Sequence, residues 1–329
     1  MRSEASPRGA PGVSRWGRIL SLTLALVAAV SAQAQTRDSA TSAPPRPRPS
    51  SVVLLPLVSV VVPGFGQLAH RDYLEGLAYG AAGVSGLALL ATADYQGTGS
   101  IDDILFDKPG ARQVFYGGGL YQGAGFLSAW DAFRSAVPVQ QETRGRFRFL
   151  PKRQESVGDL LLAPFRWEYL KRPSTWIPLG ALAGASALGV SAYRADKEST
   201  PGLEWYDYTA SDAAFTGALS MNAGVTEEAL FRGYMQPLFH QWSGERAWIS
   251  NPAQSLMFAS AHIGGVSNVP VAQALLGYYL GWVTQRNDWS LGHAVAIHFW
   301  WDVIAVSASL FTRHQVPVSL GSFSIPVDL

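Results

Sequence analysis

The stretch NAGVTEEALFRGY, residues 222–234, decides the fold of this chain. It has the apolar character of a buried helix, yet it holds two adjacent carboxylates, Glu227 and Glu228, and the arginine Arg232. Ionisable groups inside a spanning helix are costly unless they pair or line a wet cavity. Residues four apart share a helix face, so Glu228 and Arg232 can pair while Glu227, turned by about 100°, stays free. The stretch therefore predicts a polar site within a bundle of apolar helices.

The composition indicates a membrane protein. Of the 329 residues, 48% are hydrophobic and only 15% are charged, whereas about a quarter is charged in soluble domains. The 25 Lys and Arg nearly balance the 24 Asp and Glu, so nothing indicates a nucleic-acid partner. The absence of cysteine excludes disulfides, thiolate metal sites and a cysteine nucleophile. Any metal would need histidine and carboxylate ligands.

The N-terminus has the pattern of an export signal. A basic start is followed by a short apolar core, residues 19–30, and by Ala-Gln-Ala at residues 32–34, an A-x-A cleavage site. An uncleaved first anchor is the alternative, but the core is shorter than the ~20 residues that a spanning helix needs. We therefore expect cleavage, followed by an extended linker over residues 35–50, which are rich in Pro, Ser and Thr.

Apolar segments recur after the linker. In lipid each must be helical, because open strand edges and irregular backbone would leave polar groups unpaired. We therefore predict an all-α polytopic bundle of about eight spans around a polar intramembrane cavity. The expected spans are residues 52–68, 74–93, 112–133, 174–193, 209–235, 248–264, 269–285 and 291–312.

The charged segments between the spans give an orientation. The basic stretch from Arg134 to Arg153 follows the first three expected spans and belongs on the cytoplasmic side by the positive-inside rule. Residues 155–173 alternate apolar and charged groups without a spanning length, which is typical of an interfacial helix. Both mature termini then lie outside, and we expect the inner membrane of a bacterium as the location.

The segment PGFGQLAHRDYLEG, residues 63–76, resembles the PGxGQ-type helical hairpin of small bacterial membrane proteins. Its expected return helix ends in AWDAFRSA, residues 129–136, where Asp131 has the position of a helix cap. We expect a scaffold or partner-docking module without chemistry. The predicted domains are a signal peptide (1–34), a Pro-rich linker (35–50), the hairpin module (51–138), a basic loop with an interfacial helix (139–173), a core (174–312) and a C-terminal tail (313–329).

Two further polar motifs follow in the core. FASAH places Phe258 and His262 four residues apart, and HFWWD places His298 and Asp302 on one helix face. A carboxylate at that spacing can fix the tautomer of the histidine. A lone histidine is more often structural, and a Glu–Arg pair is ordinarily an ion pair. Spread over three apolar helices, however, these groups are best accommodated in one internal cavity.

The three motifs together resemble those of the CPBP family of CAAX prenyl endopeptidases and bacteriocin-processing proteins, also called Abi proteins. EEALFR is similar to EExxxR, FASAH to FxxxH and HFWWD to HxxxN/D, in family order and over about residues 174–312. The resemblance implies a bundle of spanning helices around a polar cavity and hydrolysis of peptide bonds. It further implies that Glu227 activates water with the help of His262, and that His298 and Asp302 stabilise the oxyanion.

The nature of Asp302 leaves the mechanism open, because an ionised aspartate cannot donate to an oxyanion as an asparagine amide can. Asp302 either orients His298, or is protonated, or helps to hold a metal. Glu227, His262 and His298 could form a two-His, one-carboxylate zinc site. The compact HExxH motif is absent, which favours a metal-free mechanism.

The sequence thus supports an intramembrane endopeptidase whose partners are the lipid bilayer and a membrane protein or peptide substrate. The alternative is a non-catalytic scaffold or immunity-type protein that uses the same polar residues structurally. A proton-coupled transporter is a third hypothesis, and the lack of an evident internal repeat counts against it. Prenylated CAAX tails suit eukaryotic members of the family better than a chain with an apparent bacterial export signal.

Overall fold

The computed structural model describes residues 51–95, 110–144, 155–199, 207–262, 268–311 and 323–324. The predicted signal peptide, the Pro-rich linker and all of the C-terminal tail except residues 323–324 lie outside these ranges. The helices are α2 (Leu54–Val61), α3 (Phe65–His70), α4 (Tyr73–Ala91), α6 (Ala111–Arg144), α7 (Val157–Leu162), η1 (Ala163–Phe165), α8 (Trp167–Leu170), α9 (Pro173–Ser199), α10 (Ala210–Asn222), η2 (Ala223–Glu227), η3 (Ala229–Met235), α11 (Gln236–Trp242), α12 (Ala247–Ser260), α13 (Val271–Arg286) and α14 (Gly292–Phe311).

The predicted all-helical fold is confirmed for the described residues. The only strands among them are β1 (Asn268–Val269) and β2 (Phe323–Ser324), which pair antiparallel over two residues each. By length and composition, three of the described helices can cross a membrane, namely Tyr73–Ala91, Pro173–Ala195 and Gly292–Phe311. The predicted number of about eight spans is not confirmed, because helices such as α12 and α13, with 14 and 16 residues, are shorter than the ~20 residues of a full span.

The first expected span, residues 52–68, is not one helix. It breaks after α2 at Pro63 and Gly64, and α3 begins beyond the break. Gly64 has φ +91°, and a Cβ there would lie 2.1 Å from the carbonyl oxygen of Gly76, so only glycine fits the turn. The amide of Gly64 donates to Oγ of Ser128 in α6 at 2.9 Å. The PGxGQ motif therefore forms the turn between α2 and α3 and is hydrogen-bonded to α6.

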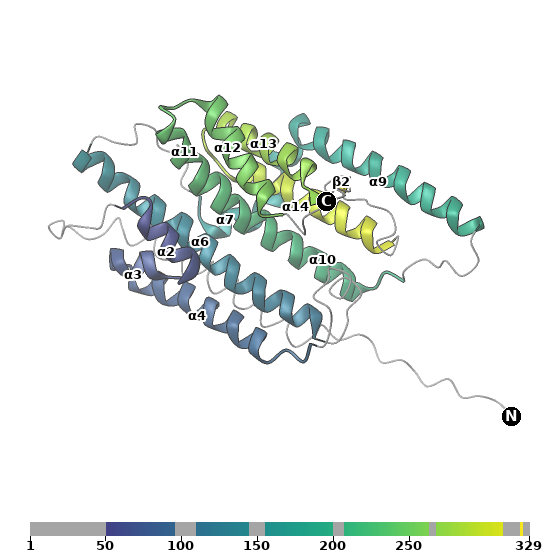
Figure 1. The fold of residues 1–329 in the computed structure, drawn as a ribbon, viewed down its shortest axis with the longest axis horizontal. Helices are drawn as coiled ribbons and strands as arrows, with labels where there is room; N and C mark the ends of the chain where they lie inside the picture. Colours follow the sequence, from purple (N-terminus) through teal and green to yellow (C-terminus); the bar gives the residue numbers. More distant parts are fainter. Residues whose placement is uncertain are drawn as a thin grey trace, which may run out of the picture.

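The long helix α6 connects the predicted hairpin module to the rest of the protein. Its 34 residues continue past residue 138, where the module was predicted to end. In Figure 1, α4 and α6 lie side by side, and α6, α10 and α9 have a similar inclination. A single apolar cluster contains Tyr79 of α4, Leu120 of α6, Val225 of η2 and Val295 of α14. The hairpin helices thus share a core with the helices that carry the polar motifs.

The expected helix over residues 209–235 starts as α10 and changes to π-helix. Thr209 caps α10 by accepting from the Asp212 amide at 3.2 Å, and Asp212 accepts in return from the Thr209 amide at 2.8 Å. The EEALFR motif starts at Glu227, the last residue of η2, and continues into η3, with Glu228 joining the two π-helical segments. Short π-helical segments often occur at functional sites.

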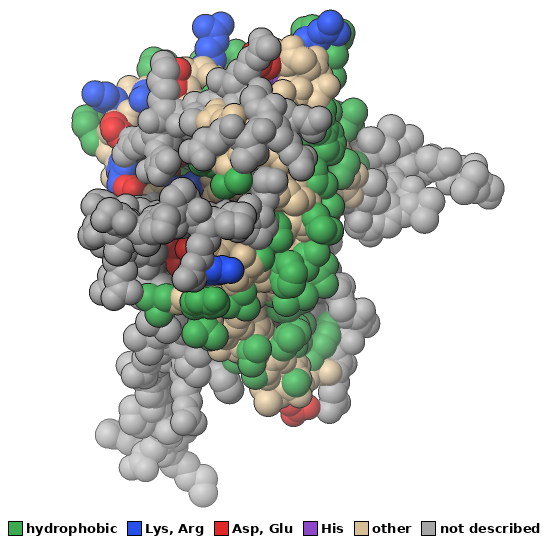
Figure 2. Space-filling view, turned by 90° about the vertical axis from the view of Figure 1, so that its left-hand side faces the viewer, with side chains coloured by type: hydrophobic (Ala, Val, Ile, Leu, Met, Phe, Trp, Pro, Cys, Tyr) green, Lys and Arg blue, Asp and Glu red, His purple; other side chains and the backbone are tan. Residues whose placement is uncertain are grey.

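Apolar side chains cover much of the described surface. Figure 2 shows hydrophobic groups along one side of the molecule and charged groups gathered mainly towards its top. Val84 of α4 and Leu188 of α9, for example, are 67% and 74% exposed, and both lie on candidate spanning helices. Such exposure is unfavourable in water and is expected of a surface that contacts lipid.

Candidate active site

Glu228 lies at the centre of the polar cluster and is completely buried. Its Oε1 atom accepts hydrogen bonds from Nη1 of Arg232 and from Nδ1 of His298, each at 2.8 Å. The Arg232 side chain, equally buried, also donates from Nη2 to the carbonyl oxygen of Gly277 at 3.1 Å. Buried charges are tolerated when such additional hydrogen bonds compensate their desolvation. Glu228 and Arg232 thereby connect the π-helical segment to α13 and α14.

The orientation of His298 follows from its contact with Glu228. A carboxylate can only accept, so Nδ1 of His298 carries the hydrogen. The opposite ring atom, Nε2, faces Oδ2 of Asp302 at 3.6 Å, which is too long for a hydrogen bond. The sequence pattern indicated Asp302 as the carboxylate that fixes the tautomer, but the nearer carboxylate is Glu228. Spacing within one helix could not show this contact, because the two residues are 70 positions apart.

Glu227 and His262 form a second contact beside the first. Nε2 of His262 lies 3.7 Å from Oε2 of Glu227. The ring of His262 is fixed from its other side, because Nδ1 is 2.8 Å from the carbonyl oxygen of Phe258 and must donate to it. His262 does not lie within α12 as predicted but in the turn that follows Ser260. This position at a helix end brings Nε2 to the carboxylate.

The Phe258 ring joins the three motifs. The Arg232 guanidinium lies over it, 4.3 Å from the ring centroid. The rings of His262 and His298 contact it at centroid distances of 4.6 and 5.8 Å. The structure therefore brings side chains of all three motifs together around one ring.

The cluster has a buried layer and an accessible layer. The side chains of Glu228 and Arg232 are 0% exposed and that of His298 is 3% exposed. The accessible side chains are those of Glu227, His262 and Asp302, which are 19%, 31% and 20% exposed. Oε2 of Glu227 is itself buried and accepts no hydrogen bond from the described residues. An incoming molecule would meet the accessible side chains first. The buried side chains would hold the accessible ones in position.

Two neighbouring residues have structural contacts instead. Asn222 packs against α6, where a Cβ on Gly119 would lie 3.2 Å from its Nδ2 atom. His293, in the first turn of α14, is 1% exposed and contacts Thr175 and Asn287. Within the described part of the chain, neither residue forms a hydrogen bond or ion pair with the site residues, so the site is defined without them.

The three candidate zinc ligands are not arranged around one point. Among the described residues, no group of three or more His, Asp and Glu side chains is placed to hold a metal ion. His298, the third ligand of the hypothetical zinc site, has its Nδ1 engaged by Glu228. These side chains as they lie do not fit the two-His, one-carboxylate arrangement of a zinc site.

The fold and the site together define a helical protein with spanning-length helices and a buried Glu–Arg–His centre. A family model described as type II CAAX prenyl endopeptidase Rce1-like matches residues 209–304. This segment contains all three motifs, so the resemblance to the CPBP family is confirmed for that part of the chain. Comparison with curated proteins and with solved structures gave no match.

Proposed function

We propose that the protein is an intramembrane endopeptidase that hydrolyses a peptide bond in a membrane-delivered protein or peptide. The observation that carries the proposal is the pair of accessible groups, Glu227 and His262, beside a histidine, His298, that is fixed by Glu228. This arrangement supplies a base, an assisting group and an oriented donor within one site. The family match supports peptidase chemistry in general.

In the proposed reaction Glu227 is the general base. Its Oε2 atom takes a proton from a water molecule, and the water oxygen bonds to the carbonyl carbon of the substrate. The carbonyl oxygen becomes an oxyanion. The carbon–nitrogen bond then breaks, and the proton held by Glu227 passes to the leaving nitrogen. His262 lies 3.7 Å away and is placed to assist this transfer.

His298 is the proposed oxyanion donor. Its Nδ1–H is engaged by Glu228, whereas its Nε2 lies 3.6 Å from Oδ2 of Asp302 and stays available to an incoming group. We propose that the ring carries both hydrogens and that Nε2–H is offered to the oxyanion. Asp302 then provides a negative charge beside Nε2–H until substrate arrives. One such donor typically contributes about 3–4 kcal/mol to transition-state stabilisation.

The proposal is tested by peptidomics of membranes that contain either the wild-type protein or Glu227→Gln. The amide keeps the shape of the carboxylate but is no base, so a product peptide present only with the wild type is expected. The matched control is Glu245→Gln, since Glu245 is exposed in the turn before α12 and makes no contact with the site. The same products from both variants and the wild type would refute the proposal in favour of a non-catalytic scaffold.

A further inference from the structure

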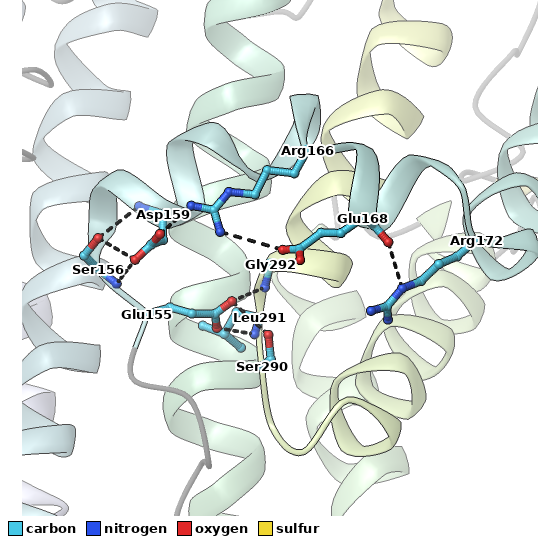
Figure 3. A network of polar contacts seen from close by, with 9 residues as sticks. All are labelled: Glu155, Ser156, Asp159, Arg166, Glu168, Arg172, Ser290, Leu291 and Gly292. Carbon is cyan, nitrogen blue, oxygen red and sulfur yellow. Dashed lines mark hydrogen bonds and ion pairs between the residues drawn. The ribbon is translucent and has the colours of Figure 1, made fainter.

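The N-terminus of α14 is held by a carboxylate from a distant part of the chain. Glu155 is 3% exposed, and its two oxygens accept from Ser290 Oγ, Leu291 N and Gly292 N at 2.8, 2.6 and 2.9 Å. Figure 3 shows the carboxylate pointing at these three groups. A negative charge there also interacts favourably with the helix dipole. Glu155 therefore fixes where α14 begins.

Glu155 is itself anchored. Arg134 of α6 donates from Nη1 to the Glu155 carbonyl oxygen at 2.7 Å. The next residue, Ser156, forms a capping box with Asp159, and Asp159 is paired with Arg166 (Figure 3). The carboxylate is thus attached to a fixed segment. Its contacts with α14 therefore define the position of that helix along its own axis.

Residues of η1, in the same segment as Glu155, contact α14 at two further positions along its length. Trp300 donates from Nε1 to the Pro164 carbonyl oxygen at 2.9 Å, and the rings of Phe165 and Phe299 meet edge to face at 5.5 Å. Phe299 and Trp300 directly follow His298 in the sequence. Contacts on both sides of His298 therefore come from residues that lie outside the matched segment 209–304.

His293 gives α14 a further fixed point in its first turn. Its Nε2 lies 2.9 Å from Oγ1 of Thr175, and its ring stacks on Tyr169 with centroids 5.7 Å apart. The Thr175 hydroxyl also donates to the Tyr169 carbonyl oxygen at 2.7 Å. The first turn of α14 is therefore fixed both along the helix axis, by Glu155, and in rotation, by His293.

We propose that Glu155 is a positioning residue for the reaction. His298 lies six residues beyond Gly292, about 9 Å along the helix axis, so a shift of the helix start is transmitted to its ring. Such a shift would lengthen the 2.8 Å contact between His298 and Glu228 and misdirect Nε2. This role rests on the proposed peptidase function, because the reaction is what the position of His298 serves.

The test compares Glu155→Gln with the wild type in detergent-purified full-length protein. The peptide used is one whose cleavage depends on Glu227. An amide cannot accept at both ends, so at least one of the three hydrogen bonds is lost. We expect kcat to fall about tenfold with KM within about twofold, because misplacement affects the reaction more than binding. We also expect faster amide hydrogen exchange over residues 291–298.

The matched control is Glu168→Gln, the same change in the same segment. The Glu168 side chain is 44% exposed, and its carboxylate lies 3.8 Å from Nη1 of Arg166. We expect wild-type kcat and exchange. Ser290→Ala serves as a milder second variant should Glu155→Gln fold poorly, since it removes one hydrogen bond and should lower kcat about two- to threefold.

The outcomes separate this role from the proposed function. Unchanged exchange over residues 291–298 in Glu155→Gln overturns the positioning role, and so does faster exchange with unchanged kcat. A wild-type protein that cleaves no peptide refutes the peptidase function instead. The exchange measurement needs no cleavage, so it reports on Glu155 and α14 in either case.

Discussion

Nδ1 of His298 lies 2.8 Å from Oε1 of Glu228, the same oxygen that accepts from Arg232. The second glutamate of the EEALFR motif is therefore shared between an arginine on its own helix and a histidine on α14. This division explains why two adjacent glutamates are present. Glu228 is used to hold other groups, which leaves Glu227 for the proposed role of general base.

Glu228→Gln should destabilise the protein more than Glu227→Gln does. The first change leaves Arg232 buried without its counter-charge, which typically costs about 3–5 kcal/mol. Glu227 is 19% exposed and is not bonded to Arg232, so its replacement should cost less than about 1 kcal/mol. Unfolding of both variants in the same detergent measures the difference. Equal stability of the two variants would contradict the assignment of Glu228 as the carboxylate that neutralises the buried Arg232.

Two replacements of His298 separate its two ring nitrogens. Asparagine can still donate to Glu228 but has nothing at the position of Nε2, and we expect kcat to fall about 10²–10³-fold. Glutamine reaches further and can place an amide donor near Nε2, so a smaller loss is expected. Cleavage assays on both variants test this order. If the asparagine variant is the more active of the two, Nε2 is not the oxyanion donor.

Asp302→Asn tests whether Asp302 acts through its charge. The motif that HFWWD resembles accepts Asn or Asp at this position, and an amide can itself donate to an oxyanion. We therefore expect Asp302→Asn to keep kcat within about tenfold of the wild type, and Asp302→Ala to lose more, because it offers neither contact. Equal loss in both would show that the carboxylate itself is required.

The pH dependence of the segment before α8 follows from Asp159, which lies outside the candidate spans. Burial by itself would raise the pKa of Asp159, but hydrogen bonds from Ser156 and Arg166 outweigh it and hold the pKa below its usual value. Since the folded pKa is the lower one, the stabilisation is fully present above the unfolded pKa of about 3.9 and is lost as pH falls through the folded pKa. Amide exchange of Val157–Leu162, corrected for intrinsic rates, should accelerate below about pH 4.

The control for this pH dependence is Asp159→Asn. It cannot ionise, so its exchange over α7 should already be faster at neutral pH and should change little down to about pH 3. An acid acceleration of equal size in the wild type and in this variant would show that another group is responsible.

Chelation is expected to leave the reaction intact. The proposed steps use side chains of the protein and no metal, so cleavage after dialysis against EDTA should stay within about twofold of the untreated rate. Elemental analysis of the purified protein gives the metal content of the same samples. Loss of cleavage with EDTA and its recovery with zinc would replace the proposed mechanism with metal-assisted hydrolysis.

Much of the helical framework could be predicted from apolar segments alone. The expected spans 74–93, 174–193, 269–285 and 291–312 correspond closely to α4, α9, α13 and α14. Hydropathy predicts such helices because a long apolar segment in lipid must pair its backbone polar groups internally, which a helix does. It did not predict the break at Pro63 and Gly64, because an apolar run has the same composition whether or not the chain reverses within it.

The composition of the site was predictable and its contacts were not. Spacing of four residues indicated the Glu228–Arg232 pair, which the structure contains. The contacts of Glu228 with His298 and of Glu155 with Gly292 join residues 70 and 137 positions apart. A single sequence carries no local signal for such pairs. The change to π-helix within the EEALFR motif likewise leaves no mark in composition.

The packing of α6 against the EEALFR segment limits how this protein can be divided. A Cβ at Gly233 would lie 2.5 Å from Cδ1 of Trp130, so the backbone of the one touches the indole of the other. Tyr234 likewise meets Phe133 at a ring distance of 5.3 Å. A truncated chain that began after residue 138 would lack Trp130 and Phe133 and would expose the surface of η3 that they cover. Fusion or excision experiments should accordingly cut before residue 51 and keep α6 together with η3.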